Sequence, residues 1–253
     1  MCGRYTSTSP IADLTRFFSV DRVVTDDLGP RYNVAPTEDV YAVAVRGDET
    51  RLGALRWGLV PGWADSPTLG SRLINARAET LLDKPAFRAA FARRRCLVPA
   101  DGFYEWQLDT GGAKQPWYIP SSQGSPLAFA GLWESWRPPG ARVAAIGADG
   151  SSSSDGGGGK AGRVVSCAIV TTAANDAVAP IHSRMPAILA PEDWANWLDP
   201  ANDDVEELQR LLAPAPGRWL APRMVRPLVN AVANDGPELI EALDVLATGA
   251  GAP

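Results

Sequence analysis

The pattern of apolar and polar positions predicts many short strands separated by turns. Runs of β-branched and aromatic residues are bounded by glycine and proline, which is typical of strands in an all-β or α+β domain. The strands that we expect are Val40–Val45, Leu52–Leu59, Arg95–Val98, Phe103–Trp106, Trp117–Ile119, Ala128–Trp133, Val164–Thr171, Met185–Leu189 and Val225–Val229. No βαβ alternation and no internal repeat accompanies them, so the sequence argues against a parallel α/β fold.

Helical spacing of apolar residues is confined to a few segments. The helices that we expect are Ile11–Phe18, Thr80–Arg94, Pro191–Trp197 and Val205–Leu212. In the second of them Phe87 and Phe91 lie one turn apart, and the arginines at its end suit the negative pole of the helix dipole. Together with the strands, these helices predict a β-rich α+β fold.

One internal stretch differs in composition from the rest of the chain. Residues 139–162 contain a run of serines followed by a run of glycines, which cannot bury enough apolar surface to offset the entropy lost on ordering. Strand-like sequence flanks the stretch on both sides, so we interpret it as a disordered insertion within one domain. We therefore expect a single domain over residues 2–235, and a C-terminal helix and loose tail over residues 236–253.

Composition excludes several classes of protein. No apolar run approaches the roughly 20 residues that cross a bilayer, and the N-terminus lacks the apolar stretch of a secretory signal peptide. Three cysteines and one histidine are too few for a disulfide framework or a histidine-rich metal centre, so we expect no metal and a cytoplasmic location. The net charge of −5 comes from residues 190–253, which hold 4 basic and 11 acidic residues, and it does not exclude nucleic-acid binding elsewhere.

The N-terminal cysteine is the first candidate for chemistry. Removal of Met1 would leave Cys2 with an α-amine of pKa roughly 8 beside a thiol of pKa about 8.5. With an aldehyde, such an aminothiol forms a Schiff base and then closes to a five-membered thiazolidine, which no internal residue can do. The alternative is that a cysteine after the initiator methionine has no role.

A carboxylate and the single histidine are the next candidates. Strand alternation puts Phe103 and Glu105 on one face and Tyr104 and Trp106 on the other. Poor solvation among aromatic side chains raises the pKa of a glutamate and suits it to proton transfer, although an exposed edge-strand glutamate remains the alternative. His182 lies in an irregular polar turn, where it is either a general acid or base or a side chain bonded only to the backbone.

Other side chains suit the binding of a phosphate backbone. Asn75 and Arg77 share a face if their segment is extended, and Arg4 lies two residues from Cys2. The ring of Trp63 could stack on a base, the alternative being core packing. Cys96 and Cys167 fall within apolar strands, where we expect inert buried thiols.

These motifs, in this order, closely resemble the SOS response-associated peptidase family. The resemblance runs from Cys2 to about Val229, and only the Gly/Ser-rich insertion departs from it. Its segments are Cys2-Gly3-Arg4-Tyr5, Arg31-Tyr32-Asn33-Val34-Ala35-Pro36-Thr37, Trp57-Gly58-Leu59-Val60-Pro61, Asn75-Ala76-Arg77-Ala78-Glu79, Arg95 to Trp106, Phe129-Ala130-Gly131-Leu132-Trp133 and His182-Ser183-Arg184-Met185-Pro186. The resemblance implies a mixed, barrel-like sheet core with peripheral helices.

The resemblance also implies a function. It describes a sensor that crosslinks covalently to abasic sites in single-stranded DNA, needs no cofactor, and removes its own Met1 as its peptidase activity. The matching roles are Cys2 as nucleophile, Asn75 as orienting amide, and Glu105 and His182 as acid and base groups. Phosphate contacts then fall on Arg4, Arg77 and Arg184, and base stacking on Trp63. We expect a monomer that joins the nucleoid when it is bound to DNA.

Three alternatives stay open at this point. Class II glutamine amidotransferases also begin with Cys-Gly after Met, but that interpretation leaves Glu105 and His182 without roles. A non-covalent reader of modified or single-stranded DNA would not need Cys2. A protease acting on other proteins would need a cleft for extended peptides, of which the sequence gives no sign.

Overall fold

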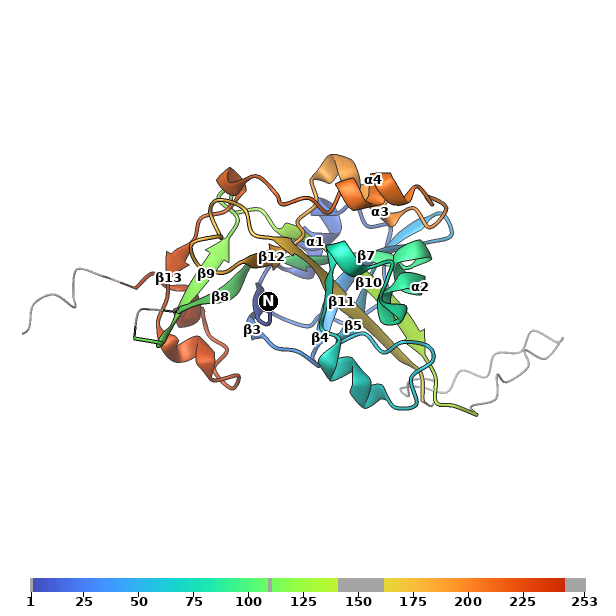
Figure 1. The fold of residues 1–253 in the computed structure, drawn as a ribbon, viewed down its shortest axis with the longest axis horizontal. Coiled ribbons are helices and arrows are strands. Elements are labelled where there is room, and N and C mark those ends of the chain that lie inside the picture. The colour runs from blue at the N-terminus through green and yellow to red at the C-terminus, as the bar shows by residue number, and fades with distance from the viewer. Residues whose placement is uncertain (1, 109–110, 141–161, 244–253) are drawn as a thin grey trace, which may run out of the picture.

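The fold is organised around a closed ring of five strands. The computed structural model describes residues 2–108, 111–140 and 162–243. The ring contains β4 (Asp39–Arg46), β5 (Glu49–Trp57), β7 (Arg95–Ala100), β10 (Leu127–Trp136) and β11 (Val164–Ala173). The pairs β5–β4, β4–β7, β7–β10 and β10–β11 are antiparallel, and a parallel pairing of β11 with β5 closes the circle (Figure 1). This closure confirms the barrel-like core.

Alternate residues of the ring strands enter two different hydrophobic clusters. In β4, Val40 and Ala42 pack in a cluster shared with the second sheet, whereas Tyr41 and Val43 pack in a cluster shared with the helices. The helices are α1 (Ile11–Phe17), α2 (Pro85–Arg93), α3 (Trp194–Leu198) and α4 (Val205–Arg210). Because both faces of β4, β7, β10 and β11 are largely buried, their sequences are mostly apolar, whereas the less buried β5 also contains Glu49, Arg51 and Arg56.

A second, antiparallel sheet lies beside the ring. Its strands, in spatial order, are β13 (Arg223–Met224), β9 (Lys114–Pro120), β8 (Gly102–Leu108), β1 (Tyr5–Ser7) and β3 (Arg31–Val34). Only Asp101 separates β7 of the ring from β8, and its carboxylate accepts hydrogen bonds from Thr8 and Ser9 at this corner. At Gly102 a β-carbon would come within 2.6 Å of the Tyr118 ring, so the crossing admits only glycine.

Short strands flank the end of β11. On one edge β6 (Asn75–Arg77) runs parallel to Ile169–Thr171, and on the other edge β12 (Arg184–Pro186) runs antiparallel to Thr171–Ala173. A further short strand, β2 (Arg22–Val23), pairs with β5. Thus β11 brings together the segments that contain Asn75 and His182, which are far apart in sequence.

Several element boundaries differ from the sequence expectations. The helix expected from Thr80 begins at Pro85, because proline is favoured in the first turn and disfavours helix in the residue before it; a 3₁₀ turn occupies Ala78–Thr80. The helix expected from Pro191 begins as a 3₁₀ turn, Pro191–Asp193, ahead of α3. The strand expected over Val225–Val229 is wrong, since a 3₁₀ turn occupies Pro227–Asn230.

The remaining elements are short. Two further 3₁₀ turns span Pro67–Arg72 and Gly217–Trp219. The strand expected over Met185–Leu189 is limited to β12. In the C-terminal segment, for which we expect a helix and a tail, Pro237–Ile240 form a 3₁₀ turn and residues 244–253 lie outside the described residues. Most of the Gly/Ser-rich insertion, residues 141–161, also lies outside them.

Candidate functional site

Cys2 lies at the junction between the ring and the second sheet. Its side chain is buried in the cluster shared by the two sheets, and the N-terminal segment lies between them (Figure 1). The Cys2 carbonyl accepts a hydrogen bond of 2.7 Å from Nδ2 of Asn75, and its Sγ lies 3.8 Å from the carbonyl oxygen of Arg4. Burial, and then the charge of Glu105, raise the pKa of the Cys2 thiol well above its usual range, so the thiol is protonated at neutral pH.

Glu105 is held beside Cys2 by β8. The strand pairs Tyr5 with Phe103, two residues before Glu105, and pairs Glu105 itself with Trp117 of β9. The Glu105 side chain is 3% exposed, and burial raises the pKa of its carboxyl to about 7. The burial agrees with the expectation of a poorly solvated glutamate and excludes the exposed edge-strand position. A carboxyl of this kind exchanges protons near neutral pH.

His182 faces Glu105 from the turn that precedes β12. Its Nδ1 lies 4.0 Å from Oε2 of Glu105, 3.0 Å from the backbone nitrogen of Arg184 and 3.2 Å from the carbonyl oxygen of Arg184. Burial lowers the pKa of the imidazole, with the charge of Arg184 acting in the same direction. His182 is therefore neutral at pH 7 and able to accept a proton.

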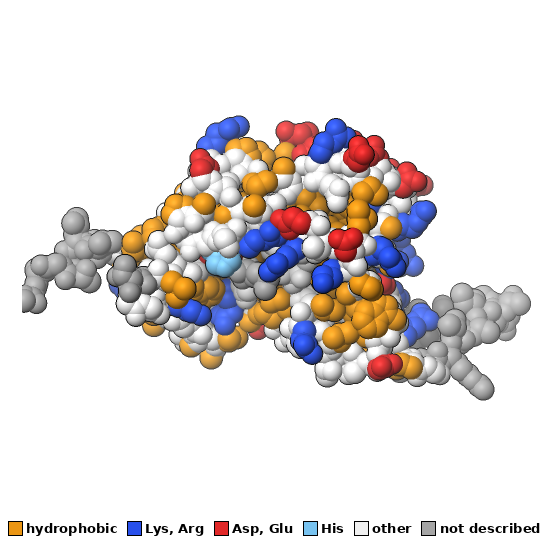
Figure 2. Space-filling view, viewed as in Figure 1, with side chains coloured by type: hydrophobic (Ala, Val, Ile, Leu, Met, Phe, Trp, Pro, Cys, Tyr) orange, Lys and Arg blue, Asp and Glu red, His pale blue; other side chains and the backbone are white. Residues whose placement is uncertain are grey.

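A surface hollow opens beside these acid and base groups. It has a volume of about 530 Å³ and is lined by Glu105, Trp106, Leu108, Lys114, His182 and Asn230. Figure 2 shows the only histidine of the chain at the surface, next to several basic side chains. Glu105 and His182 line the hollow, and the buried Cys2, with Asn75 bonded to it, lies behind Glu105; we call Cys2, Asn75, Glu105 and His182 the site cluster.

The candidate DNA-contacting residues differ in how free their polar groups are. Arg77 is exposed, and Trp63 is 61% exposed on a loop that is held by a hydrogen bond from Nε1 of Trp136 to the Ala64 carbonyl. In contrast, the guanidinium of Arg4 donates to Asn33 and Val229, and that of Arg184 donates to Glu79 and Thr171. Contacts of all four with phosphates or bases stay predictions.

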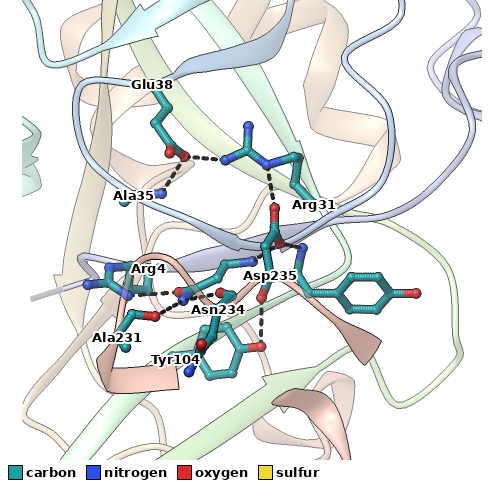
Figure 3. Close-up of polar contacts among 10 residues, drawn as sticks. Arg4, Arg31, Ala35, Glu38, Tyr104, Ala231, Asn234 and Asp235 are labelled. Carbon is teal, nitrogen blue, oxygen red and sulfur yellow. Dashed lines mark hydrogen bonds and ion pairs between the residues drawn. The ribbon is translucent and has the colours of Figure 1, made fainter. Parts of the chain in front are cut away.

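The sequence analysis missed a polar network next to the site. The buried Asn33 donates through Nδ2 to the carbonyls of Val229, Ala231 and Asn234, at 3.3, 3.1 and 2.9 Å. Asp235 binds Arg31, which in turn binds Glu38 (Figure 3). These residues, with Arg4, fasten the segment 229–235 onto β3, and we call Arg4, Arg31, Asn33, Glu38 and Asp235 the C-terminal lock.

No feature of the described residues indicates a metal or a membrane span. Within residues 2–108, 111–140 and 162–243, no group of three or more His, Cys, Asp or Glu side chains is placed to hold a metal ion. No helix in the same ranges is long and apolar enough to cross a bilayer. Cys96 and Cys167 are both buried, as expected, and burial raises the pKa of each thiol.

Comparison with known proteins gives consistent relatives over nearly the whole chain. The abasic site processing protein YoqW of Bacillus subtilis is 38% identical over 96% of this chain and 100% of its own length. The abasic site processing protein YedK of Escherichia coli is 30% identical over 95% of this chain and 99% of its own. The abasic site processing protein HMCES of Gallus gallus is 32% identical over 85% of this chain and 67% of its own.

A solved structure and a family model agree with these relatives. A crystal structure of a protein from Bacteroides thetaiotaomicron shares the fold with a TM-score of 0.77 at 23% identity, covering 96% of this chain and 100% of that one. The family model described as SOS response associated peptidase (SRAP) matches residues 1–232. With the motifs, the ring of strands and the site cluster in agreement, the chain belongs to the SOS response-associated peptidase family.

Proposed function

We propose that this protein processes abasic sites in DNA by forming a covalent bond between Cys2 and the ring-opened sugar. The observation that carries the proposal is the meeting of Cys2, Asn75, Glu105 and His182 at one place, from segments separated along the chain. The names of the relatives, which are abasic site processing proteins, support the same substrate. An abasic site exists partly as a free aldehyde, which is the electrophile that an N-terminal aminothiol captures.

The proposed reaction begins at the amine and ends at the thiol. With Met1 removed, the Cys2 amine attacks the aldehyde carbon, and loss of water gives a Schiff base. The Cys2 sulfur then bonds to the same carbon while the thiol proton moves to the nitrogen, so the product is a thiazolidine and one water is released. The raised pKa of the thiol favours this order, because the buried thiol does not compete as a thiolate for the aldehyde.

The other residues of the cluster supply proton transfer and orientation. The neutral His182 accepts a proton as the sugar ring opens. Glu105, whose pKa is about 7, exchanges protons with the nitrogen and oxygen during Schiff-base formation and its reversal, and reversal by elimination would give a lyase activity. Asn75 fixes the Cys2 backbone through its hydrogen bond to the carbonyl, which aims the amine.

Two finer parts of the proposal concern maturation and binding. Hydrolysis of the Met1–Cys2 bond by the protein itself would consume one water and expose the amine; Met1 lies outside the described residues. The strand bound is single-stranded DNA, with Arg4, Arg77 and Arg184 near phosphates and the exposed ring of Trp63 against a base. We expect the protein to act as a cytoplasmic monomer that joins the nucleoid while bound to DNA.

Denaturing gel electrophoresis tests the proposal. Purified protein, with loss of Met1 verified by mass spectrometry, is mixed with a single-stranded oligonucleotide that contains one abasic site. We expect a band that resists heat and SDS for wild type and for the control variant Cys96→Ala, whose thiol is buried in the ring strands. Cys2→Ala should give no such band, and Cys2→Ser should give only a Schiff base that reduction can trap. Absence of the band for wild type, with retained DNA affinity, would replace the proposal with a non-covalent reader.

A further inference from the structure

An ion pair joins two segments of the site across the end of β11. Nη1 and Nη2 of Arg184 donate to Oε1 and Oε2 of Glu79 at 2.6 and 3.0 Å, which is the two-pronged geometry that arginine forms with a carboxylate. The Arg184 side chain is 16% exposed and that of Glu79 is 52% exposed. Glu79 follows the strand that contains Asn75, whereas Arg184 begins the strand that follows His182.

The guanidinium also binds the strand that lies between these two segments. Nη2 of Arg184 donates to the carbonyl oxygen of Thr171 at 2.6 Å and lies 3.3 Å from its Oγ1. Thr171 pairs with Arg77 on one edge of β11 and with Pro186 on the other. Arg184 therefore ties both edges of β11 together at the place where the site cluster is assembled.

The backbone of the same arginine holds the imidazole of His182 through Nδ1. The N–H of Arg184 lies 3.0 Å from Nδ1, and the carbonyl oxygen of Arg184 lies 3.2 Å from it. Nδ1 bonds the N–H when it carries no proton and the carbonyl when it does, so this backbone holds the ring in either tautomer. A shift of β12 would change this hydrogen bond and the 4.0 Å approach of Nδ1 to Glu105 together.

We propose that Glu79 is a positioning residue, which holds Arg184 across the end of β11 and thereby keeps the imidazole of His182 in place, facing Glu105. Glu79 touches none of the reacting groups in this scheme and acts through Arg184. It also offsets the positive charge of Arg184 at the imidazole, which Glu105 and Lys114 face from the second sheet. The part of the proposal that concerns reaction rate rests on the proposed function, whereas the part that concerns the histidine does not.

A rival role for Glu79 makes the opposite predictions. Its carboxylate could occupy a place that a DNA phosphate takes over when the strand binds Arg184. In that case Glu79→Gln would free Arg184 and tighten the binding of intact single-stranded DNA. The slope of log K against log[salt], where K is the association constant for DNA, would become steeper by about 0.7. A positioning role predicts little change in affinity and a slower reaction.

The single histidine allows a direct readout. Nitrogen-15 NMR of the imidazole reports the tautomer and the titration midpoint of His182 without overlap, because the chain has no other histidine. It is recorded for wild type, Glu79→Gln and Glu79→Asp. The matched control is Glu134→Gln, which breaks the 2.6 Å ion pair between Glu134 of β10 and Arg94, the residue between α2 and β7. Crosslinking rates at saturating abasic DNA and affinities for intact single-stranded DNA are measured for the same proteins.

We expect Glu79→Gln to change the ratio of the two tautomers of His182 and to lower its titration midpoint, with a crosslinking rate reduced about tenfold and an unchanged affinity for intact single-stranded DNA. Glu79→Asp should restore part of the wild-type histidine spectrum and part of the crosslinking rate. Glu134→Gln should match wild type in both. A wild-type histidine spectrum and rate in Glu79→Gln, or tighter DNA binding with an unchanged rate, would overturn the proposal. If the Glu79→Gln protein melts at a much lower temperature than Glu134→Gln, its slower reaction could reflect lost stability. The charge-retaining variant Glu79→Asp then tests the positioning role by the same NMR and rate measurements. Failure of wild type to crosslink would count against the proposed function, and the NMR comparison would still decide the role of Glu79.

Discussion

The C-terminal lock and the site cluster each contain a buried or half-buried asparagine, and the two are used in different ways. In the lock, Oδ1 of Asn33 accepts from Arg4 at 2.8 Å and Nδ2 donates to three carbonyls, so both ends of the amide are bonded within the protein. In the site cluster, Nδ2 of Asn75 donates to Cys2, but its buried Oδ1 has no hydrogen-bond partner among the described residues.

The difference is between a network whose hydrogen bonds are all made within the protein and a cluster with one buried acceptor left over. A buried amide with all its groups bonded lowers the free energy of the folded state and specifies one arrangement. A buried acceptor with no partner costs stability, and such groups occur where a ligand completes the bonding. The lock is therefore complete without a ligand, whereas Asn75 keeps one buried acceptor unbonded, which agrees with the role in substrate binding that we propose for it.

The sharpest test of the comparison exchanges each asparagine for alanine. Asn33→Ala leaves several buried carbonyls and the Arg4 guanidinium without partners, and we expect a loss of about 3 kcal/mol in the free energy of unfolding. Asn75→Ala removes one hydrogen bond together with an unsatisfied acceptor, and we expect a change within about 1 kcal/mol. Urea unfolding at pH 7 measures both. Equal losses for the two variants would remove the distinction between lock and site.

The pH dependence of stability provides a second test. The pKa of Glu105 is about 7 in the folded protein against an ordinary value of 4.5, so the folded state binds the proton more tightly between these two values. Stability due to this group is therefore present in full below pH 4.5 and is lost as the pH rises towards 7, by about 2–3 kcal/mol.

Glu105→Gln should remove this loss. We expect wild type and the variant to have similar melting temperatures at pH 5, and the variant to melt at a higher temperature at pH 8. The same variant should crosslink about a hundredfold more slowly, since it cannot exchange a proton. Parallel melting curves across the pH range would show that the Glu105 carboxylate is well solvated and would contradict its assignment to the reactive cluster.

The sequence was sufficient to predict the long strands and to name four residues that the structure brings together, whose roles stay predictions. Strands such as β4 and β10 have alternating or continuous apolar runs bounded by turns, which is the signal that sequence reasoning uses best. The face alternation of Phe103 and Tyr104 was also correct, because the two side chains pack in different clusters. Cys2, Glu105 and His182 were found from their chemistry and from the family motifs.

What the sequence could not predict depends on contacts between distant segments. The parallel pairing of β11 with β5 closes the ring, and β6 is a strand only because β11 lies beside it. Arg4 and Arg184 also bind Asn33 and Glu79 within the protein, which lie 29 and 105 residues away along the chain, and the sequence analysis expected only phosphate contacts for them. No local pattern announces such a partner, so an arginine of the fold and an arginine of the ligand look alike in the sequence.

The smallest expected effect separates these two kinds of arginine. Arg77 is exposed, so Arg77→Gln should leave the melting temperature unchanged and lower the dependence of log K on log[salt] for single-stranded DNA by about 0.7, the loss of one phosphate contact. Arg4 belongs to the lock, so Arg4→Gln should lower the melting temperature in addition to any change in the salt dependence. Fluorescence anisotropy over a salt series measures the slope. The opposite result would be an Arg77→Gln variant with the wild-type slope and an Arg4→Gln variant with a lower slope and an unchanged melting temperature. The phosphate contact would then belong to Arg4, and the C-terminal lock would be part of the DNA-binding surface.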